Sequence, residues 1–136
     1  MDNQKFIYPK SVRQRPSFAE VSGRVREQLE IDCLIDDTGR YPPEADDIVN
    51  IVADAYCRNP RGCMRIEGEL IDTDTVCGMF RQLRCEHVAL VIERLRAVNY
   101  PIKNKAAYLR TALYNSLLEI NAHYANLYAS NGGADG

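Results

Sequence analysis

The segment between two proline sites, Pro42-Pro43 and Pro60, places the tightest limit on how this chain can fold. Proline is tolerated in the first turn of a helix but not in its interior, so a helix can start at Pro42-Pro43 and must end before Pro60. The acids after Pro43 suit the positive end of a helix dipole, and apolar residues then recur at helical spacing. These apolar residues are Ile48, Val52, Ala55 and Tyr56. The segment therefore predicts a helix with one buried face.

Capping and spacing signals predict further helices on both sides. Ser17 and Glu20 have capping-box spacing, which predicts a helix that runs to about Leu29. Asp72 or Thr73 can cap a helix near the middle of the chain, and Asn104 can cap a long last helix. The apolar faces of these helices supply the expected core: Val25, Leu29, Ile48, Val52, Phe80, Leu83, Val88, Val91, Leu95, Tyr108 and Leu113.

Strands are expected at one place. Two short runs at 64–66 and 69–71 are separated by Glu67-Gly68, which has the length of a two-residue hairpin turn. A hairpin this small must pack on helices to persist. The predicted fold class is thus all-α: a single compact domain of five to six short helices, with a minor β-hairpin near residues 64–71.

The length of 136 residues fits one domain. Residues 1–16 contain Lys and Arg but few periodic apolar positions, so we expect a flexible basic leader or linker remnant there. The domain should cover 17–129, followed by a disordered tail at 130–136 that lacks large apolar residues. No apolar run approaches the roughly 18 to 20 residues that span a bilayer, and no signal peptide is evident. We therefore expect a cytoplasmic protein without a membrane partner.

The sequence carries little catalytic chemistry. Its five cysteines are an odd number without Cys-x-x-Cys spacing, so we expect reduced thiols and no metal site. Cys85 and His87 would diverge by about 200° on a helix, which disfavours a catalytic pair. No Gly-rich phosphate loop is present. We expect a protein that is not an enzyme and needs no cofactor.

Two charged surfaces are candidates for binding. An acidic patch is expected from Asp36, Asp37, Glu44, Asp46 and Asp47, either as a solvated face or as a surface that steers a charged partner. A mixed cationic, amide and aromatic surface is expected near the start of the last helix, and such a mixture suits protein or nucleic acid. It comprises Lys103, Asn104, Lys105, Tyr108, Arg110, Tyr114 and Asn115. The spacing of Tyr108 also fits a core stripe, so this ring should be at least partly buried.

Five segments carry a family resemblance: 31–35, 45–54, 64–68, 83–88 and, most specific, 102–115. On these segments the chain, from about Leu29 to Leu127, resembles the C-terminal domain of RepA-type replication initiators. Such initiators are carried by plasmids and integrative elements of Gram-positive bacteria. Their C-terminal domain is similar to the helical second domain of the primosome protein DnaD, whose tyrosine and aliphatic signature is matched by Tyr108, Leu109, Ala112 and Leu113.

The resemblance implies a role in recruitment. In that family a winged-helix domain elsewhere in the protein recognises the origin, and the C-terminal domain engages host replication proteins. We therefore expect a non-enzymatic interaction domain that recruits host primosome proteins, either the primase or the helicase loader. The alternative is a module that binds DNA directly, possibly as a single strand, with phosphate contacts from Lys103, Lys105 and Arg110.

Overall fold

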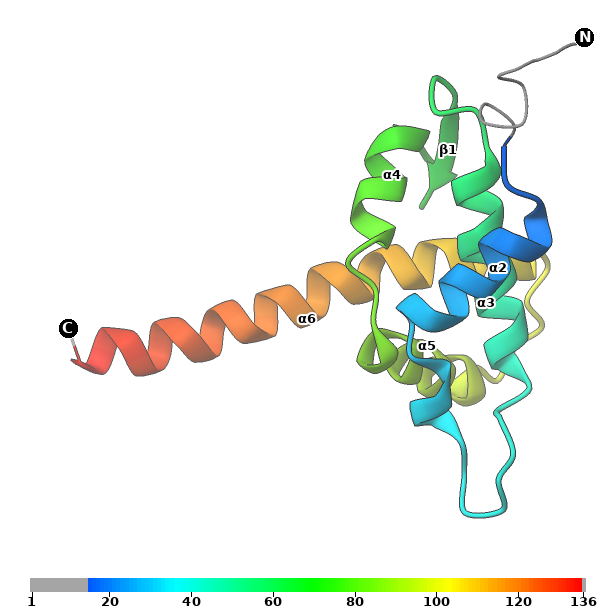
Figure 1. Ribbon diagram of the computed structural model, residues 1–136. Coiled ribbons are helices and arrows are strands. Elements are labelled where there is room, and N and C mark those ends of the chain that lie inside the picture. Colours follow the sequence, from blue (N-terminus) through cyan, green and yellow to red (C-terminus); the bar gives the residue numbers. More distant parts are fainter. Residues whose placement is uncertain (1–14, 136) are drawn as a thin grey trace, which may run out of the picture.

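The computed structural model describes residues 15–135, with the backbone alone for 123–125 and 128–135. It consists of a mostly helical body from which the last helix projects (Figure 1). The elements are α2 (Phe18–Gln28), the 3₁₀ helix η1 (Ile31–Leu34), α3 (Glu44–Cys57), β1 (Cys63–Ile66), β2 (Glu69–Asp72), α4 (Thr73–Phe80), α5 (Cys85–Ala97) and α6 (Lys105–Asp135). The prediction of a mainly helical domain with one small hairpin is confirmed.

Local signals set the ends of the first helices. The Ser17 hydroxyl accepts a hydrogen bond of 3.1 Å from the Glu20 N–H, and the Glu20 carboxylate accepts one of 2.8 Å from the Ser17 N–H. This confirms the capping box predicted for α2. Helix α3 begins directly after Pro43 and ends before Pro60, as the two proline sites require.

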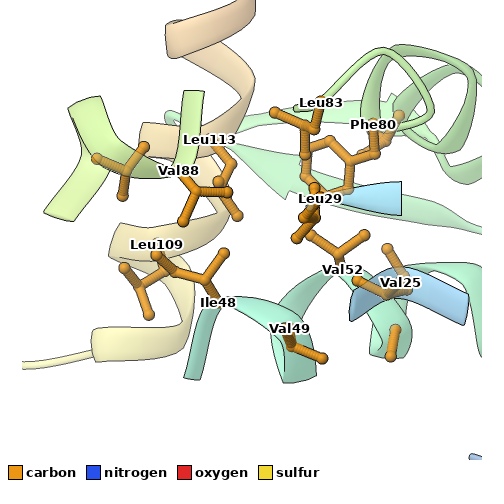
Figure 2. Close-up of a cluster of buried hydrophobic side chains, with 14 of the residues drawn as sticks. Val25, Leu29, Ile48, Val49, Val52, Phe80, Leu83, Val88, Leu109 and Leu113 are labelled. Atoms are coloured by element: carbon orange, nitrogen blue, oxygen red, sulfur yellow. The ribbon is translucent and has the colours of Figure 1, made fainter. Parts of the chain in front are cut away.

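The core lies between the helices of the body and includes most of the predicted residues (Figure 2). Leu95 and Tyr108 are partly buried and pack against it. On α6 the fully buried apolar residues are Leu109, Leu113 and Leu117, and of these the predicted core included Leu113. Spacing along α6 fits a buried stripe through Tyr108 or one through Leu109, whereas the orientation of α6 on the body selects the second.

The hairpin predicted at 64–71 is also confirmed. Strands β1 and β2 pair antiparallel, with Ile66 opposite Glu69. The two turn residues, Glu67 and Gly68, have φ angles of 54° and 84°. A two-residue turn with both φ angles positive has the twist that matches flanking antiparallel strands, and glycine adopts such an angle without a Cβ penalty.

Helix α6 is the long last helix that the sequence predicted, and it extends further than expected. It has 31 residues and continues to Asp135, through most of the segment expected to be a disordered tail. Once a helix is nucleated within a folded body, each added residue gains a backbone hydrogen bond without a new nucleation cost. Weak helix formers can therefore extend the helix. Residues 1–14 of the expected leader lie outside the described residues. Within the described part of the chain, no helix is both long and apolar enough to span a membrane.

Candidate functional site

An open trough with a volume of about 670 Å³ runs along α6, between α5 and the hairpin. Aliphatic side chains of both helices line it, namely Leu90, Val91, Ala107 and Ala112. Polar and charged side chains complete the lining: Arg65, Glu67, Arg94, Asn104, Tyr108, Arg110, Thr111, Asn115, Ser116 and Glu119. The trough therefore combines apolar area with hydrogen-bonding groups, which is typical of a recognition site.

One edge of the trough is the hairpin turn, which is fastened to α6. The Glu67 N–H donates a hydrogen bond of 3.1 Å to the Thr111 hydroxyl. The Asn115 side-chain amide donates one of 2.7 Å to the Glu67 carboxylate. These contacts supply the helix support that so small a hairpin needs, and they hold this edge of the trough in place.

The opposite edge is closed by an ion pair between α5 and α6. The Arg94 guanidinium lies 2.5 Å from the Glu119 carboxylate. This hydrogen bond lowers the pKa of Glu119 and raises the pKa of Arg94. Both side chains are about half exposed, so the pair mainly sets the position of the two groups.

Arg110 has unused hydrogen-bonding capacity at the trough. Its Nη1 donates a long hydrogen bond of 3.5 Å to the Arg65 carbonyl, and its buried Nε has no hydrogen-bond partner among the described residues. Burial lowers the pKa of Arg110, and the nearby Arg58 charge lowers it further. A guanidinium stays protonated at neutral pH even so, and its planar donors suit a carbonyl or carboxylate of a partner.

Four of the seven residues predicted for the mixed surface line the trough: Asn104, Tyr108, Arg110 and Asn115. The Asn104 carboxamide also caps α6, because its oxygen accepts a hydrogen bond of 3.0 Å from the Ala107 N–H. Lys103 is exposed outside the trough, and Tyr114 packs against the core. Lys105 lies 2.9 Å from Asp47 and forms an ion pair with it.

Sequence reasoning missed several lining residues. Those on α6 were detectable, because Thr111 and Glu119 continue the helical spacing of Tyr108 and Asn115. Arg65, Glu67 and Arg94 come from other elements, and no local pattern links them to this face of α6.

Comparison with known sequences identifies the family. The sequence model of a family described as "Family of unknown function (DUF6017)" matches residues 12–134. The chain belongs to this family. The comparison of this chain with curated proteins found no match, and the comparison with solved structures found none either.

In this DUF6017 chain, three acids of the predicted acidic patch are paired with basic residues of other helices. Glu44 accepts two hydrogen bonds from Arg96 of α5, at 2.7 and 2.8 Å. Asp46 pairs with Arg26 of α2, and Asp47 pairs with Lys105 of α6. The first turn of α3 thus forms ion pairs with three other helices, α2, α5 and α6. These pairs largely compensate its negative charge.

The other two acids of the patch lie in the loop before α3. The Asp36 carboxylate accepts hydrogen bonds from the Thr38 hydroxyl and from the N–H groups of Thr38 and Arg40. These bonds, the hydroxyl first, lower the pKa of Asp36. Asp37 is exposed and has no ion pair with any described residue. Most of this patch in the DUF6017 domain is therefore paired with side chains or backbone groups of the same chain.

Of Cys85 and His87, the histidine has a structural role. The buried His87 Nδ1 accepts a hydrogen bond of 2.9 Å from the Arg84 N–H and so caps α5. Burial lowers the pKa of His87 and raises that of the Cys85 thiol, so the thiolate form of Cys85 is disfavoured. Among the described residues, no three His, Cys, Asp or Glu side chains come together as a metal site.

Proposed function

We propose that this chain is a non-enzymatic interaction domain of a plasmid or mobile-element replication initiator, and that it recruits a host primosome protein through the trough along α6. The partner is the primase or the helicase loader. The resemblance to RepA-type C-terminal domains supports the recruitment role, and its most specific segment, 102–115, contributes part of the lining of the trough.

The composition of the trough favours a protein as the partner. Aliphatic side chains of α5 and α6 supply apolar area, while Arg110 and Asn115 supply donors at the edge nearest the hairpin. Protein interfaces commonly combine an apolar centre, aromatic and arginine anchors and a polar rim. Tyr108, which is partly buried within the trough, fits the part of an aromatic anchor.

Direct DNA binding is the second candidate, and arginines near the hairpin favour it. Arg65 and Arg110 both line the trough, and the Arg58 charge is close enough to Arg110 to lower its pKa. Against this candidate, Lys105 is compensated by Asp47 and Arg58 by Asp54, which leaves fewer cations for phosphate.

A matched pair of variants tests the proposal. Ala107 lines the trough, whereas the neighbouring Ala106 is exposed outside it. Ala107→Arg should fill part of the trough and weaken binding to a purified primase or helicase loader by about tenfold or more, while Ala106→Arg adds the same charge and should bind like the wild type. Isothermal titration calorimetry measures both affinities.

The same variants distinguish DNA binding. A module that binds phosphate would gain affinity for labelled DNA from either added arginine, and its affinity would fall steeply between about 50 and 200 mM salt. Fluorescence anisotropy with single- and double-stranded DNA reads this out. Salt-sensitive DNA binding without binding to either host protein would replace the recruitment proposal with the second candidate.

A further inference from the structure

The two carboxylates that line the trough are satisfied within the domain. Glu67 accepts a hydrogen bond of 2.7 Å from the Asn115 side chain. Glu119 lies 2.5 Å from Arg94 and forms an ion pair with it. Neither carboxylate therefore needs a cation from a partner, and both would repel an anion that came close to them.

The two arginines on the hairpin side of the trough have no such partner. Arg65 donates a hydrogen bond of 2.6 Å to the Gly68 carbonyl, and Arg110 donates a long one of 3.5 Å to the Arg65 carbonyl. Neither guanidinium forms an ion pair with a carboxylate in the described part of the chain. This side of the trough therefore carries positive charge that the domain does not compensate.

Arg110 is the better placed of the two to bind a group inside the trough. Its side chain is partly buried, whereas that of Arg65 is exposed, and its buried Nε has no hydrogen-bond partner among the described residues. Burial lowers the pKa of Arg110, and the Arg58 charge lowers it further. A carboxylate at this guanidinium would supply the acceptor that Nε lacks and would offset the unfavourable burial of the charge.

The rest of the lining favours an occupant with few charges. Leu90 and Val91 of α5 and Ala107 and Ala112 of α6 give the trough an apolar area that gains from contact with apolar side chains. A nucleic-acid strand carries a phosphate on every nucleotide, so it would bring several anions into a trough that also holds two carboxylates. A peptide with apolar side chains and one acid fits both the charges and the apolar area.

We propose that the trough binds an apolar segment of the partner protein that carries an Asp or Glu side chain, and that this carboxylate pairs with Arg110. The inference rests on the trough being the interaction site proposed above. The Arg110 guanidinium donates two parallel hydrogen bonds to the carboxylate oxygens, which is the strong geometry for this pair. Arg65 contributes a second positive charge on the same side of the trough.

A random peptide library displayed on phage tests the inference without assuming which host protein binds. Peptides of about 16 residues suit the roughly 22 Å of α6 between Asn104 and Glu119. Ala107→Trp fills part of the trough without adding charge, and Ala106→Trp places the same ring outside it. Peptides that lose binding to the first variant and keep it to the second occupy the trough. These peptides should be enriched in Asp or Glu among apolar residues.

A double-mutant cycle then measures the contact with Arg110 by isothermal titration calorimetry. An amide in place of the acid of a selected peptide should weaken binding to the wild type by about tenfold or more, and to Arg110→Gln by less than about twofold. Lys103→Gln removes the same charge outside the trough and should behave like the wild type. Arg110→Lys keeps the charge but not the two parallel bonds, so its loss should be intermediate. Circular dichroism checks that each variant is folded.

Three results would overturn the inference: no peptide that occupies the trough, trough peptides without enrichment in Asp or Glu, or an equal effect of the amide peptide on the wild type and Arg110→Gln. The recruitment proposal would still stand in each case if the intact primase or helicase loader binds and Ala107→Arg weakens that binding. Acidic trough peptides without affinity for either host protein would support the inference and overturn the choice of partner.

Discussion

The Asn115 side chain donates a hydrogen bond of 2.7 Å to Glu67, a residue 48 positions earlier in the chain. Asn115 belongs to α6 and Glu67 to the tight turn between β1 and β2. Together with the hydrogen bond from the Glu67 N–H to Thr111, this contact joins the smallest element of the fold to the longest. The hairpin edge of the trough therefore depends on α6 for its position.

Thr111→Val should loosen the hairpin without unfolding the body. The variant keeps the shape of the side chain but removes the acceptor of the Glu67 N–H, at a cost of about 0.5 to 1.5 kcal/mol. Amide hydrogen exchange should accelerate in β1 and β2 and stay unchanged in α2. Thr75→Val is the control, since Thr75 is exposed on α4. Equal exchange rates of the hairpin amides in the two variants would show that the hydrogen bond to Thr111 does not hold the hairpin in place.

Leu113→Asp should unfold the domain. Leu113 is fully buried, and an unpaired carboxylate there costs several kcal/mol against a total stability of roughly 5 to 15 kcal/mol. Leu118→Asp, at an exposed position on the same helix, should leave the thermal midpoint nearly unchanged. Thermal unfolding followed by circular dichroism compares the two variants. A folded Leu113→Asp variant would show that Leu113 is not part of the buried core.

The pair between Glu44 and Arg96 should make stability depend on acid pH. The hydrogen bonds from Arg96 lower the pKa of Glu44 below its ordinary 4.5. The unfolded state then binds more protons, so the contribution is fully present above pH 4.5 and is lost as the pH falls through the folded-state pKa. Arg96→Gln should therefore be slightly less stable than the wild type at neutral pH, since Arg96 is largely exposed and solvent weakens the pair.

Urea unfolding at a series of pH values measures this difference. The gap between the wild type and Arg96→Gln should close as the pH falls well below 4.5. Arg24→Gln is the control, because Arg24 is an exposed arginine of α2 outside this pair. A gap that stays constant with pH would show that Arg96 acts through packing and not through the Glu44 charge.

His87 should remain neutral at mildly acidic pH. Burial lowers its pKa below the ordinary 6.5, and its Nδ1 must stay unprotonated to accept from the Arg84 N–H. The unfolded state binds the extra proton, so stability should decline as the pH falls below 6.5 towards the folded-state pKa. Nitrogen NMR shifts of the His87 ring report its protonation directly. His87→Gln, which cannot titrate, should lack this part of the decline.

The sequence by itself determined the features that depend on neighbouring residues. Ser17 and Glu20 cap α2, the prolines bound α3, and Glu67-Gly68 forms the hairpin turn, because each depends on backbone geometry within a few positions. Most of the core was also predictable, since apolar spacing marks the buried face of each helix. Of the trough, Asn104, Tyr108, Arg110 and Asn115 were predicted from their mixture of cationic, amide and aromatic side chains near the start of the last helix.

Only the tertiary structure decided which distant side chains meet. The sequence predicted an acidic patch that includes Glu44, Asp46 and Asp47. In the structure these three acids pair with basic side chains of α5, α2 and α6, respectively. The trough likewise needs the hairpin and α5 beside α6, and the packing of the body sets where those elements lie. Spacing along one helix shows which residues share a face, but not which element covers that face, because packing depends on contacts between residues far apart in the chain.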